Sequence, residues 1–596
     1  MSKYSAPLAD MRFVLFDLLH VDAQYARLPG GEAASRDTVD AILDEAAKFA
    51  EQVLAPLNAS GDEEGCKLDK ATATVTTPKG FKEAYAKYVE GGWPSLTAPE
   101  KYGGQHLPDS IGAPLKEMLD SANLSWGNFP LLSHGASEAL KQHGEEWQRE
   151  VFLKPIVEGR WTGTMCLTEP HCGSDLGLLR TRAEPNADGT YAVSGTKIFI
   201  TAGEHDFTEN IVHLVLARLP DAPAGVKGIS LFIVPKFNVG KDGKMGARNA
   251  VACASIEHKM GIKASVTCVM NFDGAQGWLI GQPNRGLSAM FTMMNTARLA
   301  VGIQGLGLIE RGYQASLAYA RERLQGRALS GPKFTEKPAD PLIVQPDIRR
   351  MLLTQKAFAE GCRAMSYYAA TLVDLVERSP DAEERKRADE LLSFLIPIVK
   401  GMLTELANEC TYHAVQIHGG HGYIWDTGVE QFERDARITS IYEGTTGIQA
   451  LDLLGRKIMQ TQGVGFKHFL EEISAFCEAG STQAALTEFI GPVAVAAKEW
   501  SDLTQTVGKR ATNNPDEIGA AAVDFLFYSG YVALAYFWAK SVAAADASKL
   551  SDEFKQAKRS TARFYFARIL PRTQAHLAAI RAGADSLLAM TDAQFG

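Results

Sequence analysis

One carboxylate in the sequence is placed where a proton-transfer base would be useful. Glu443 lies between Tyr442 and Gly444, just before a segment whose helical periodicity begins near Thr445. The apolar neighbours Ile441 and Tyr442 would desolvate the carboxylate, and desolvation raises a carboxyl pKa toward the range of a general base working near neutral pH. An acid at a helix start is also stabilised by the helix macrodipole without any catalytic role. From spacing alone, the two interpretations have equal support.

A glycine-rich turn precedes this carboxylate in the segment 416–449. Gly419, Gly420 and Gly422 surround His421 there. Because glycine has no Cβ, such a run lets the backbone approach a ligand closely. The spacing is not that of the GxGxxG turn, and no strand signal precedes it, so a Rossmann-type dinucleotide site is not indicated.

Two shorter segments combine hydroxyl groups with a turn or an aromatic ring. In Met165–Asp175, Thr168 and Ser174 flank a Pro/Gly turn whose N–H and hydroxyl groups suit a polar ring or a phosphate. Further along, Phe199 and Thr201 would share one face of a strand. Each pattern alone is more typical of an ordinary turn or strand.

The elements that carry these residues change character along the chain. Helical periodicity surrounds a stretch rich in short β-branched and aromatic runs, which is typical of strands. The pattern predicts a multi-domain α+β protein with five parts: an N-terminal extension (1–35), an N-terminal helical domain (36–160), a middle β domain (161–282), a C-terminal helical bundle that holds the candidate base (283–462) and an additional C-terminal helical domain (463–596).

Composition narrows the class of partner and the type of site. The net charge is −9, which disfavours nucleic acid as the main partner because phosphate binding needs clustered Lys and Arg. The eight cysteines form no CxxC pair and no Cys/His cluster at metal-ligand spacing, so we expect reduced thiols and no metal site. The most apolar stretch, 518–545, contains Asp524 and Lys540, which favours a buried helix over membrane contact. The first residues lack the pattern of a signal peptide, so a cytoplasmic location is expected.

Taken together, three of these segments resemble the acyl-CoA dehydrogenase family. The matching motifs are CLTEPHCGSD from Cys166, the segment 416–435, and IYEGTTGIQ from Ile441. They occur in the family's order and spacing within 36–457. The runs YSAPLADMRFVLFD, ARERLQG and IQALDLLGRK are similar to a longer subfamily that includes 3-methylmercaptopropionyl-CoA dehydrogenases and bacterial long-chain enzymes.

The resemblance implies the cofactor FAD and a role for each matching position. It assigns Glu443 as the base, with Tyr442 and Gly444 beside the substrate. It implies that Asn295 and Arg298 contact the CoA portion, and that Ser174 lies between flavin phosphate and acyl-CoA. The implied FAD contacts are Met165, Leu167, Thr168, Ser174, Phe199, Thr201, Arg323, Gln416, Gly419, Gly420 and Thr445.

The family also shows where this chain differs. Some members carry the base one position before the arginine that matches Arg298, but here that position is Ala297, which cannot take a proton. Cys172 replaces a smaller residue, Gln431 stands where Lys or Arg is common, and Gly447 lacks a side chain that some members use on FAD. These differences bear on adenosine recognition and the dimer contact rather than on the chemistry.

The implied activity is α,β-dehydrogenation of acyl-CoA thioesters to trans-2-enoyl-CoA, in fatty acid β-oxidation or 3-methylmercaptopropionyl-CoA breakdown. The implied partners are an electron-transfer flavoprotein as acceptor and a second copy in a homodimer or dimer of dimers, in a bacterial cytoplasm. An acyl-CoA oxidase, which passes electrons to oxygen, is the nearest alternative. A DNA-associated flavoprotein relative is a weaker one, because 463–596 has about as many acidic as basic residues.

Overall fold

The computed structural model describes residues 3–596, which divide into two compact units. We call them the helical unit and the sheet unit. The helical unit comprises the chain up to 47, with 113–121 and 301–596, and the sheet unit comprises 48–112 and 122–300. These units do not follow the order of the chain, because α3 (Arg36–Phe49), α6 (Gly112–His143) and α9 (Gly286–Glu322) each contribute residues to both.

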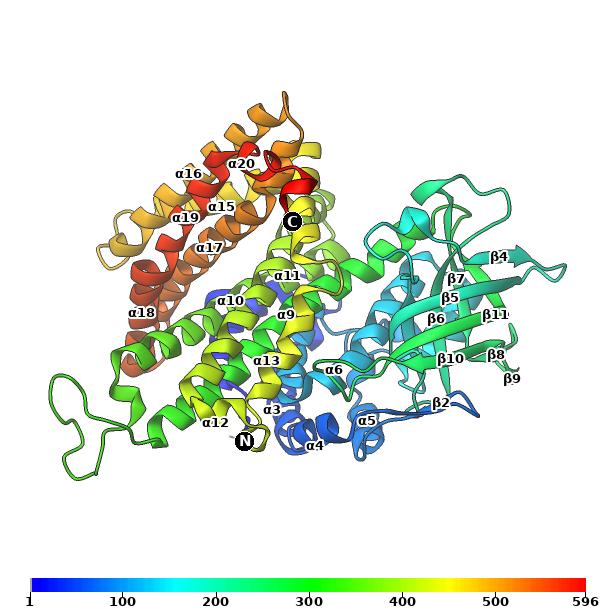
Figure 1. The fold of residues 1–596 in the computed structure, drawn as a ribbon, viewed down its shortest axis with the longest axis horizontal. Helices are drawn as coiled ribbons and strands as arrows, with labels where there is room; N and C mark the ends of the chain where they lie inside the picture. The colour runs from blue at the N-terminus through cyan, green and yellow to red at the C-terminus, as the bar shows by residue number, and fades with distance from the viewer. Residues whose placement is uncertain (1–2) are drawn as a thin grey trace. The chain divides into compact units, whose positions relative to one another are not determined.

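The sheet unit is built on a seven-stranded sheet, in which six strands follow the order β10-β11-β5-β4-β6-β3. The remaining strand, β7, pairs with both β11 and β6, so β11, β5, β4, β6 and β7 form a closed ring of strand pairings (Figure 1). The strands are β3 (Trp161–Cys166), β4 (Arg182–Pro185), β5 (Tyr191–Thr201), β6 (Asn210–Arg218), β7 (Ile229–Pro235), β10 (Val251–Ile256) and β11 (Thr267–Ile280), with the small pairs β1 (Lys67–Asp69) and β2 (Thr74–Thr76), and β8 (Phe237–Val239) and β9 (Met245–Arg248).

Two strands of this ring, β6 and β7, are buried on both faces. β7 is buried at every position and β6 at all but its last residue, which is why they read as continuous apolar runs rather than alternating ones. Helix α6 packs on β3 at Gly163, where a Cβ would come within 2.3 Å of the Ala136 Cβ. The other helices of the unit are α4 (Leu57–Glu64), α5 (Phe81–Glu90), α7 (Glu146–Gln148) and α8 (Lys154–Val157).

The helical unit is a bundle whose long helices have clear local start and stop signals. Pro346 occupies the first position of α10, where its missing N–H costs nothing. The Asp381 side chain caps α11 by accepting a hydrogen bond from the Glu383 N–H at 2.9 Å. The helices are α1 (Leu8–Arg12), α2 (Val21–Tyr25), α9, α10 (Pro346–Arg378), α11 (Ala382–His418), α12 (Gly420–Tyr423), α13 (Glu430–Ala436), α14 (Thr446–Leu451), α15 (Val464–Gly480), α16 (Thr487–Ala511), α17 (Asp516–Ala547), α18 (Asp552–Phe564), α19 (Thr573–Ala582) and α20 (Asp585–Leu588).

Two glycines let α9 and α11 cross at close range. A Cβ on Gly302 would lie 2.5 Å from the Val399 side chain, and one on Gly305 would lie 2.8 Å from the Leu403 carbonyl. Backbone carbonyls cannot move aside as a flexible side chain can. The crossing therefore needs small residues on α9, and it helps to hold the bundle that carries Glu443.

Helix α17 is the apolar centre of the C-terminal helices. It packs against α16, α18 and α19, and also against α10 and α11, as the orange and red helices beside the green ones show (Figure 1). By length and composition α17 could cross a membrane, but 67% of its most apolar stretch is buried. That burial agrees with the expectation of a core helix in the stretch 518–545.

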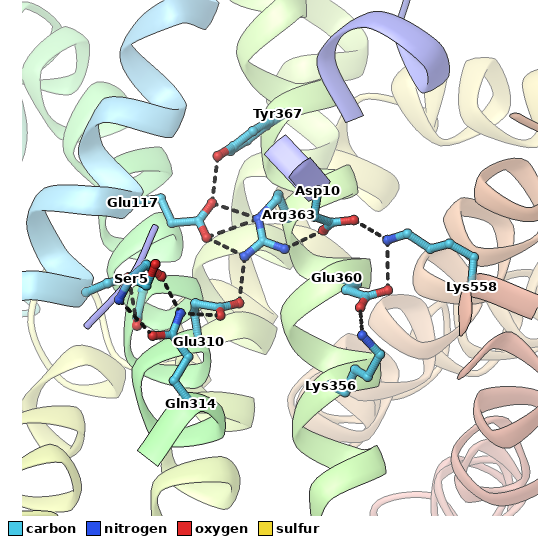
Figure 2. A network of polar contacts seen from close by, with 12 residues as sticks. Ser5, Asp10, Glu117, Glu310, Gln314, Lys356, Glu360, Arg363, Tyr367 and Lys558 are labelled. Atoms are coloured by element: carbon cyan, nitrogen blue, oxygen red, sulfur yellow. Dashed lines mark hydrogen bonds and ion pairs between the residues drawn. The ribbon is translucent and has the colours of Figure 1, made fainter. Parts of the chain in front are cut away.

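A buried network of charges joins distant parts of the helical unit (Figure 2). The Arg363 guanidinium on α10 donates to Glu117, to Glu310 at 2.8 Å and to Asp10 at 2.5 Å. Lys558 on α18 donates to the other oxygen of Asp10 and to Glu360 at 2.7 Å. Because every charge in this network has an opposite partner, the cost of burying it is largely offset.

The predicted fold class is confirmed, with two local differences. The short β1–β2 hairpin lies in a region predicted to be helical. Two neighbouring runs rich in β-branched and aromatic residues, 191–195 and 197–201, form one long strand, β5, rather than two short ones. The five sequence boundaries stay a prediction, because compactness groups the chain by contact and not by chain order.

Candidate active site

Glu443 lies on a tight turn with an unusual backbone. Its φ is +54°, and the φ of the next residue, Gly444, is +92°. Left-handed φ is uncommon for a residue with a side chain, so surrounding contacts must hold Glu443 there. The Gln449 side chain donates to the Glu443 carbonyl at 3.0 Å, and the buried Lys400 ammonium donates to the Gly444 carbonyl. The turn thus presents a half-buried carboxylate on an anchored backbone.

The position of the turn bears on the alternative interpretation of Glu443. Helix α14 begins at Thr446, and Thr445 is its N-cap, with its hydroxyl accepting from the Ile448 N–H at 3.3 Å. Glu443 therefore lies two residues before the cap. The first turn of α14 contains no acidic residue. Since the macrodipole acts within the first turn, it gives little reason for an acid at this position.

The two apolar neighbours of Glu443 differ in environment. The Tyr442 hydroxyl donates to Gln304 on α9, and burial raises the pKa of Tyr442 far above its ordinary value, so the phenol stays neutral. Ile441 is 44% exposed in the structure. Of the two residues expected to desolvate Glu443, only Tyr442 is thus packed within the helical unit.

The glycine turn at the end of α11 is open. Gly419 has φ +59° and ψ −137°, a conformation close to glycine-only, and a Cβ on Gly419 or Gly420 would meet nothing within 4 Å. Gly422 has another role, because a Cβ there would lie 2.3 Å from the Val415 carbonyl. Gln416, Arg323 and Thr445 are exposed. The helical unit therefore offers an accessible backbone at Gly419–Gly420.

In the sheet unit the two hydroxyl-bearing segments lie side by side. The turn after β3 closes with a hydrogen bond from the Glu169 N–H to the Cys172 carbonyl, at 2.9 Å. The Thr168 carbonyl accepts from the Ile198 N–H of β5, also at 2.9 Å. Met165, Leu167 and Thr168 are partly buried, and Ser174 is exposed. The structure thus brings together the segments around Thr168 and Phe199, which are far apart in the sequence.

A β-bulge sets the exposed face of β5. The register with β11 shifts near Phe199, whose φ is +59°. Before the shift Val193 and Lys197 are buried, and after it Ile200 and Ala202 are buried. The shift leaves Phe199 60% exposed, with Thr201 next on the same side. This burial pattern agrees with a common face for Phe199 and Thr201, but the bulge that produces it has no signal in the sequence.

The residues expected at the CoA portion differ in exposure. On α9, Asn295 is exposed, whereas Arg298 and Ala297 are buried. All three belong to the sheet unit. The predicted site residues are divided between the two units. The sheet unit contains Met165, Leu167, Thr168, Ser174, Phe199, Thr201, Asn295 and Arg298. The helical unit contains Arg323, Gln416, Gly419, Gly420, Tyr442, Glu443, Gly444 and Thr445.

Sequence reasoning missed three polar residues that hold these segments. Lys400 and Gln449 anchor the Glu443 turn, and Lys197 links the segment around Thr168 to β5 through hydrogen bonds to the Leu167 carbonyl and to Glu169. A signal was present for the lysines, because each is a single charge in an apolar stretch. A buried lysine needs a partner, but the sequence does not name that partner.

Family models match four consecutive parts of the chain. They are the N-terminal domain of acyl-CoA dehydrogenase at 36–160, its middle domain at 164–275, its C-terminal domain at 284–459, and a domain described as acetyl-CoA dehydrogenase C-terminal like at 469–591.

Named relatives match over nearly the full length. The 3-methylmercaptopropionyl-CoA dehydrogenase of Ruegeria pomeroyi is 44% identical, over 98% of this chain and 99% of the relative. A broad-specificity linear acyl-CoA dehydrogenase of Mycobacterium tuberculosis is 35% identical over 96% of each chain.

Solved structures agree with the fold. An acyl-CoA dehydrogenase from Bacillus anthracis in complex with FAD matches with a TM-score of 0.75 and 20% identity, over 94% of this chain and 90% of that one. Butyryl-CoA dehydrogenase from Megasphaera elsdenii matches at 0.57 and 26%, over 70% and 97%. A chain from a study of the electron transferring flavoprotein of Acidaminococcus fermentans matches at 0.57 and 26%, over 70% and 96%.

These matches cover all the segments described above. The chain therefore belongs to the acyl-CoA dehydrogenase family and is an FAD-dependent oxidoreductase that dehydrogenates acyl-CoA thioesters.

Proposed function

We propose that Glu443 is the base that removes the α-proton of the acyl-CoA thioester, giving a trans-2-enoyl-CoA product. The observation that carries this assignment is the left-handed turn at Glu443 and Gly444, anchored by Gln449 and Lys400. A base held on a fixed turn needs no search for its position before proton transfer, which is the main advantage of preorganisation. Ala297 offers no competing carboxylate.

Each unit has groups that suit a part of an FAD molecule. An exposed aromatic ring at Phe199 suits the face of a flavin ring, and the open backbone at Gly419 and Gly420 suits phosphates. Thr168 and Thr201 would contact the flavin ring in the sheet unit, and Ser174 would lie between the flavin phosphate and the acyl-CoA. Further contacts would come from Met165, Leu167, Arg323, Gln416 and Thr445. When bound, FAD supplies the acceptor for the hydrogen that leaves the β-carbon.

The backbone near Glu443 has a second task in this mechanism. As the α-proton leaves, negative charge develops on the thioester carbonyl oxygen. The Glu443 N–H would donate to that oxygen, and one such donor is worth ~3–4 kcal/mol in other enzymes. Tyr442 and Gly444 would line the acyl group, and Asn295 and Arg298 would contact the CoA portion.

The variant Glu443→Gln tests the assignment, because it keeps the shape and removes the base. We expect α-proton exchange of the substrate and flavin reduction to fall by ~10²–10⁴-fold, the usual contribution of a general base. The matched control is Asp426→Asn, which also replaces a carboxylate by an amide, at an exposed position of the same unit. Near-wild-type flavin reduction by Glu443→Gln with a good substrate would contradict the assignment of Glu443 as the base.

We propose a linear acyl-CoA as substrate, with either a fatty chain or the thioether chain of 3-methylmercaptopropionyl-CoA. The support is the likeness to relatives named for these substrates. A kcat/KM profile across chain lengths, with 3-methylmercaptopropionyl-CoA included and an artificial electron acceptor, tests this. Activity only on branched substrates would contradict the proposal.

We propose an electron-transfer flavoprotein as electron acceptor. The support is the likeness to a chain from a study of such a flavoprotein. An acyl-CoA oxidase would instead produce one peroxide per product without any added acceptor. Stoichiometric peroxide in an air-saturated assay would favour the oxidase.

We propose that the chain forms a homodimer, or a dimer of dimers, through the surface next to Gly419–Gly420. Four large apolar side chains are exposed there on the helical unit: Tyr412, Tyr423, Ile424 and Trp425. A cluster of this kind beside a binding segment is typical of an interface. Light scattering of Trp425→Asp would show a shift toward monomer, whereas an unchanged mass would exclude this surface.

We propose a bacterial cytoplasmic location. All eight cysteines are unpaired and seven are buried, which fits a reducing compartment. Fractionation of cells that express a tagged chain tests the location. Recovery in the periplasm would contradict it.

A further inference from the structure

The two segments of the sheet unit expected at the flavin are joined by a buried lysine. Lys197 lies in β5, two residues before Phe199, and none of its surface is exposed. Its ammonium donates to the Leu167 carbonyl at 2.9 Å and to the Glu169 carboxylate at 2.9 Å. The two acceptors stand on either side of Thr168 in the chain.

Glu169 is satisfied by donors from one further segment. One of its oxygens also accepts from the Thr181 N–H at 3.0 Å and from the Thr181 hydroxyl, and the other accepts from the Arg180 N–H at 2.8 Å. Burial alone would raise the pKa of Glu169, but Lys197 and these hydrogen bonds hold it below its ordinary value. The carboxylate therefore stays charged beside the ammonium.

The lysine fixes the direction of one backbone donor. The Leu167 carbonyl and the Thr168 N–H belong to the same planar peptide, so they point in opposite directions. With the carbonyl held by Lys197, the N–H must point away from Lys197. The peptide on the other side of Thr168 is held through its carbonyl by the Ile198 N–H.

The same strand holds the strained bulge. Phe199 has φ +59° and Ala202 has φ +53°, and such values persist only where surrounding contacts impose them. Lys197 and Ile198 are tied to the segment around Thr168 on one side of Phe199. The Ala202 N–H donates to the Val266 carbonyl at 3.0 Å on the other side. The bulge is thus clamped from both ends.

We propose that the Glu169–Lys197 pair is a positioning device for the flavin, which sets the Thr168 N–H and the exposed Phe199 as one rigid unit without touching the cofactor. This inference rests on the proposed function, in which Thr168 and Phe199 face the flavin ring. The Lys197 charge polarises the Leu167–Thr168 peptide, which makes its N–H a stronger donor. A donor aimed at a ring that gains negative charge on reduction favours the reduced form.

A metal ion is a less suitable occupant for this cluster. Glu169, His171 and Cys172 bring one possible ligand atom each within 4.8 Å of one another. The Glu169 oxygen next to Lys197 is already used by that ammonium, and the positive charge would repel a cation. The cluster is better described as a charged link between two segments.

The test compares three variants of the full-length holoenzyme. Lys197→Met removes the charge and both hydrogen bonds, Glu169→Gln keeps part of the hydrogen bonding, and the third variant combines them. We measure the Kd of FAD for the apoprotein by calorimetry and the flavin midpoint potential by spectroelectrochemistry. For Lys197→Met we expect a weaker Kd by about tenfold or more, since a small misplacement of binding groups costs up to ~100-fold, and a more negative potential.

The other two variants test the coupling. Glu169→Gln should shift both quantities in the same direction by less, so it also serves if Lys197→Met folds poorly. The double variant should be no worse than Lys197→Met alone, because the two residues act through one pair. Additive effects of the two substitutions would overturn the proposal.

Lys236→Met is the matched control. Lys236 is a nearly buried lysine of the same unit that pairs with Glu204, and it makes no contact with the segment around Thr168. It should lower the unfolding temperature but leave the Kd and the potential unchanged. Equal shifts in Lys197→Met and Lys236→Met would reduce the pair to a structural role. The outcome for Glu443→Gln is independent, because that variant reports on proton removal and not on the flavin potential.

Discussion

At the residue scale, the candidate base depends on a backbone conformation that two side chains maintain. Glu443 and Gly444 are both left-handed, and Gln449 and Lys400 bind the two carbonyls of this turn. Neither of these side chains lies next to Glu443 in sequence. Changes to the turn should therefore affect catalysis even where the carboxylate itself is kept.

Gly444→Ala should lower kcat by ~10–100-fold, because the base would be misplaced. The φ of +92° is strained for alanine, and its Cβ would lie 2.8 Å from the Gln449 amide that holds the Glu443 carbonyl. Steady-state kinetics with an artificial acceptor measures the effect. Gly447→Ala is the control in the same segment, since its Cβ would come no closer than 4.0 Å to the Thr445 hydroxyl. Equal losses in both variants would show that the turn at Gly444 is not special.

At the element scale, two histidines that bond to hydroxyls of strand β3 are kept neutral by burial: His213 on β6, and His205 in the segment before β6. His213 lies 2.8 Å from the Thr164 hydroxyl, and His205 lies 2.9 Å from the Thr162 hydroxyl. Burial, together with the positive charge of Lys236, lowers the pKa of each histidine to about 3. Because the unfolded histidines protonate at their ordinary pKa, their contribution to stability is complete above about pH 6.5 and is lost as the pH falls toward 3.

His213→Gln should reduce the acid sensitivity of the sheet unit. Glutamine can still bond to Thr164 but does not titrate, so the stability lost between about pH 6.5 and pH 5 should shrink by up to ~2 kcal/mol. Calorimetric unfolding at about pH 7.5 and about pH 5 measures this difference. The variant keeps His205, so part of the dependence should remain. An unchanged loss on acidification would mean that His213 does not titrate on unfolding as described.

Helix α17 offers a matched pair of glycines that separates packing from helix propensity. A Cβ on Gly530 would lie 2.6 Å from the side chain of the buried Met402 on α11, whereas one on Gly519 would meet nothing within 4 Å. Gly530→Ala should destabilise the helical unit by ~1–3 kcal/mol through overpacking. Gly519→Ala should be neutral or stabilise by up to ~1 kcal/mol. Urea denaturation measures both, and a stabilising Gly530→Ala would contradict the tight contact.

At the scale of the whole helical unit, the charged network connects the two ends of the chain. Asp10 and Lys558 are 548 residues apart and share a hydrogen bond inside the unit (Figure 2). Burial alone would raise the pKa of Asp10, but Lys558 and Arg363 lower it to about 2. Its contribution to stability is therefore complete above the ordinary carboxyl range and is lost as the pH falls through about 2.

Lys558→Met should destabilise the protein by ~3–5 kcal/mol, because it leaves buried carboxylates with fewer partners. The released N-terminal segment should then be cleaved faster by trypsin at Arg12. Arg559→Met on the same helix is the control, since its partners Glu488 and Asp546 are partly exposed and such pairs are worth less than ~1 kcal/mol. Similar unfolding temperatures for the two variants would show that the network does not hold the ends.

Local signals in the sequence were enough for the fold class, and they account for some of the helix ends. Helix α10 starts at Pro346 and ends two residues before Pro380, and α11 ends just before Gly419. Proline and glycine set these ends through their own backbone preferences, so no information from distant residues is needed. The motifs around Thr168 and Glu443 were enough for the family. The roles of the individual site residues, including Glu443, stay predictions until the variants above are measured.

Contacts between distant residues decided the rest. Glu443 and Phe199 adopt left-handed backbone, which a residue with a side chain takes only where neighbours impose it, and those neighbours come from elsewhere in the chain. The hydrogen-bond partners of Lys197, Lys400 and Lys558 could not be predicted from the sequence either. A sequence shows that a buried charge needs a partner, but only the packing of helices and strands brings that partner within hydrogen-bonding distance.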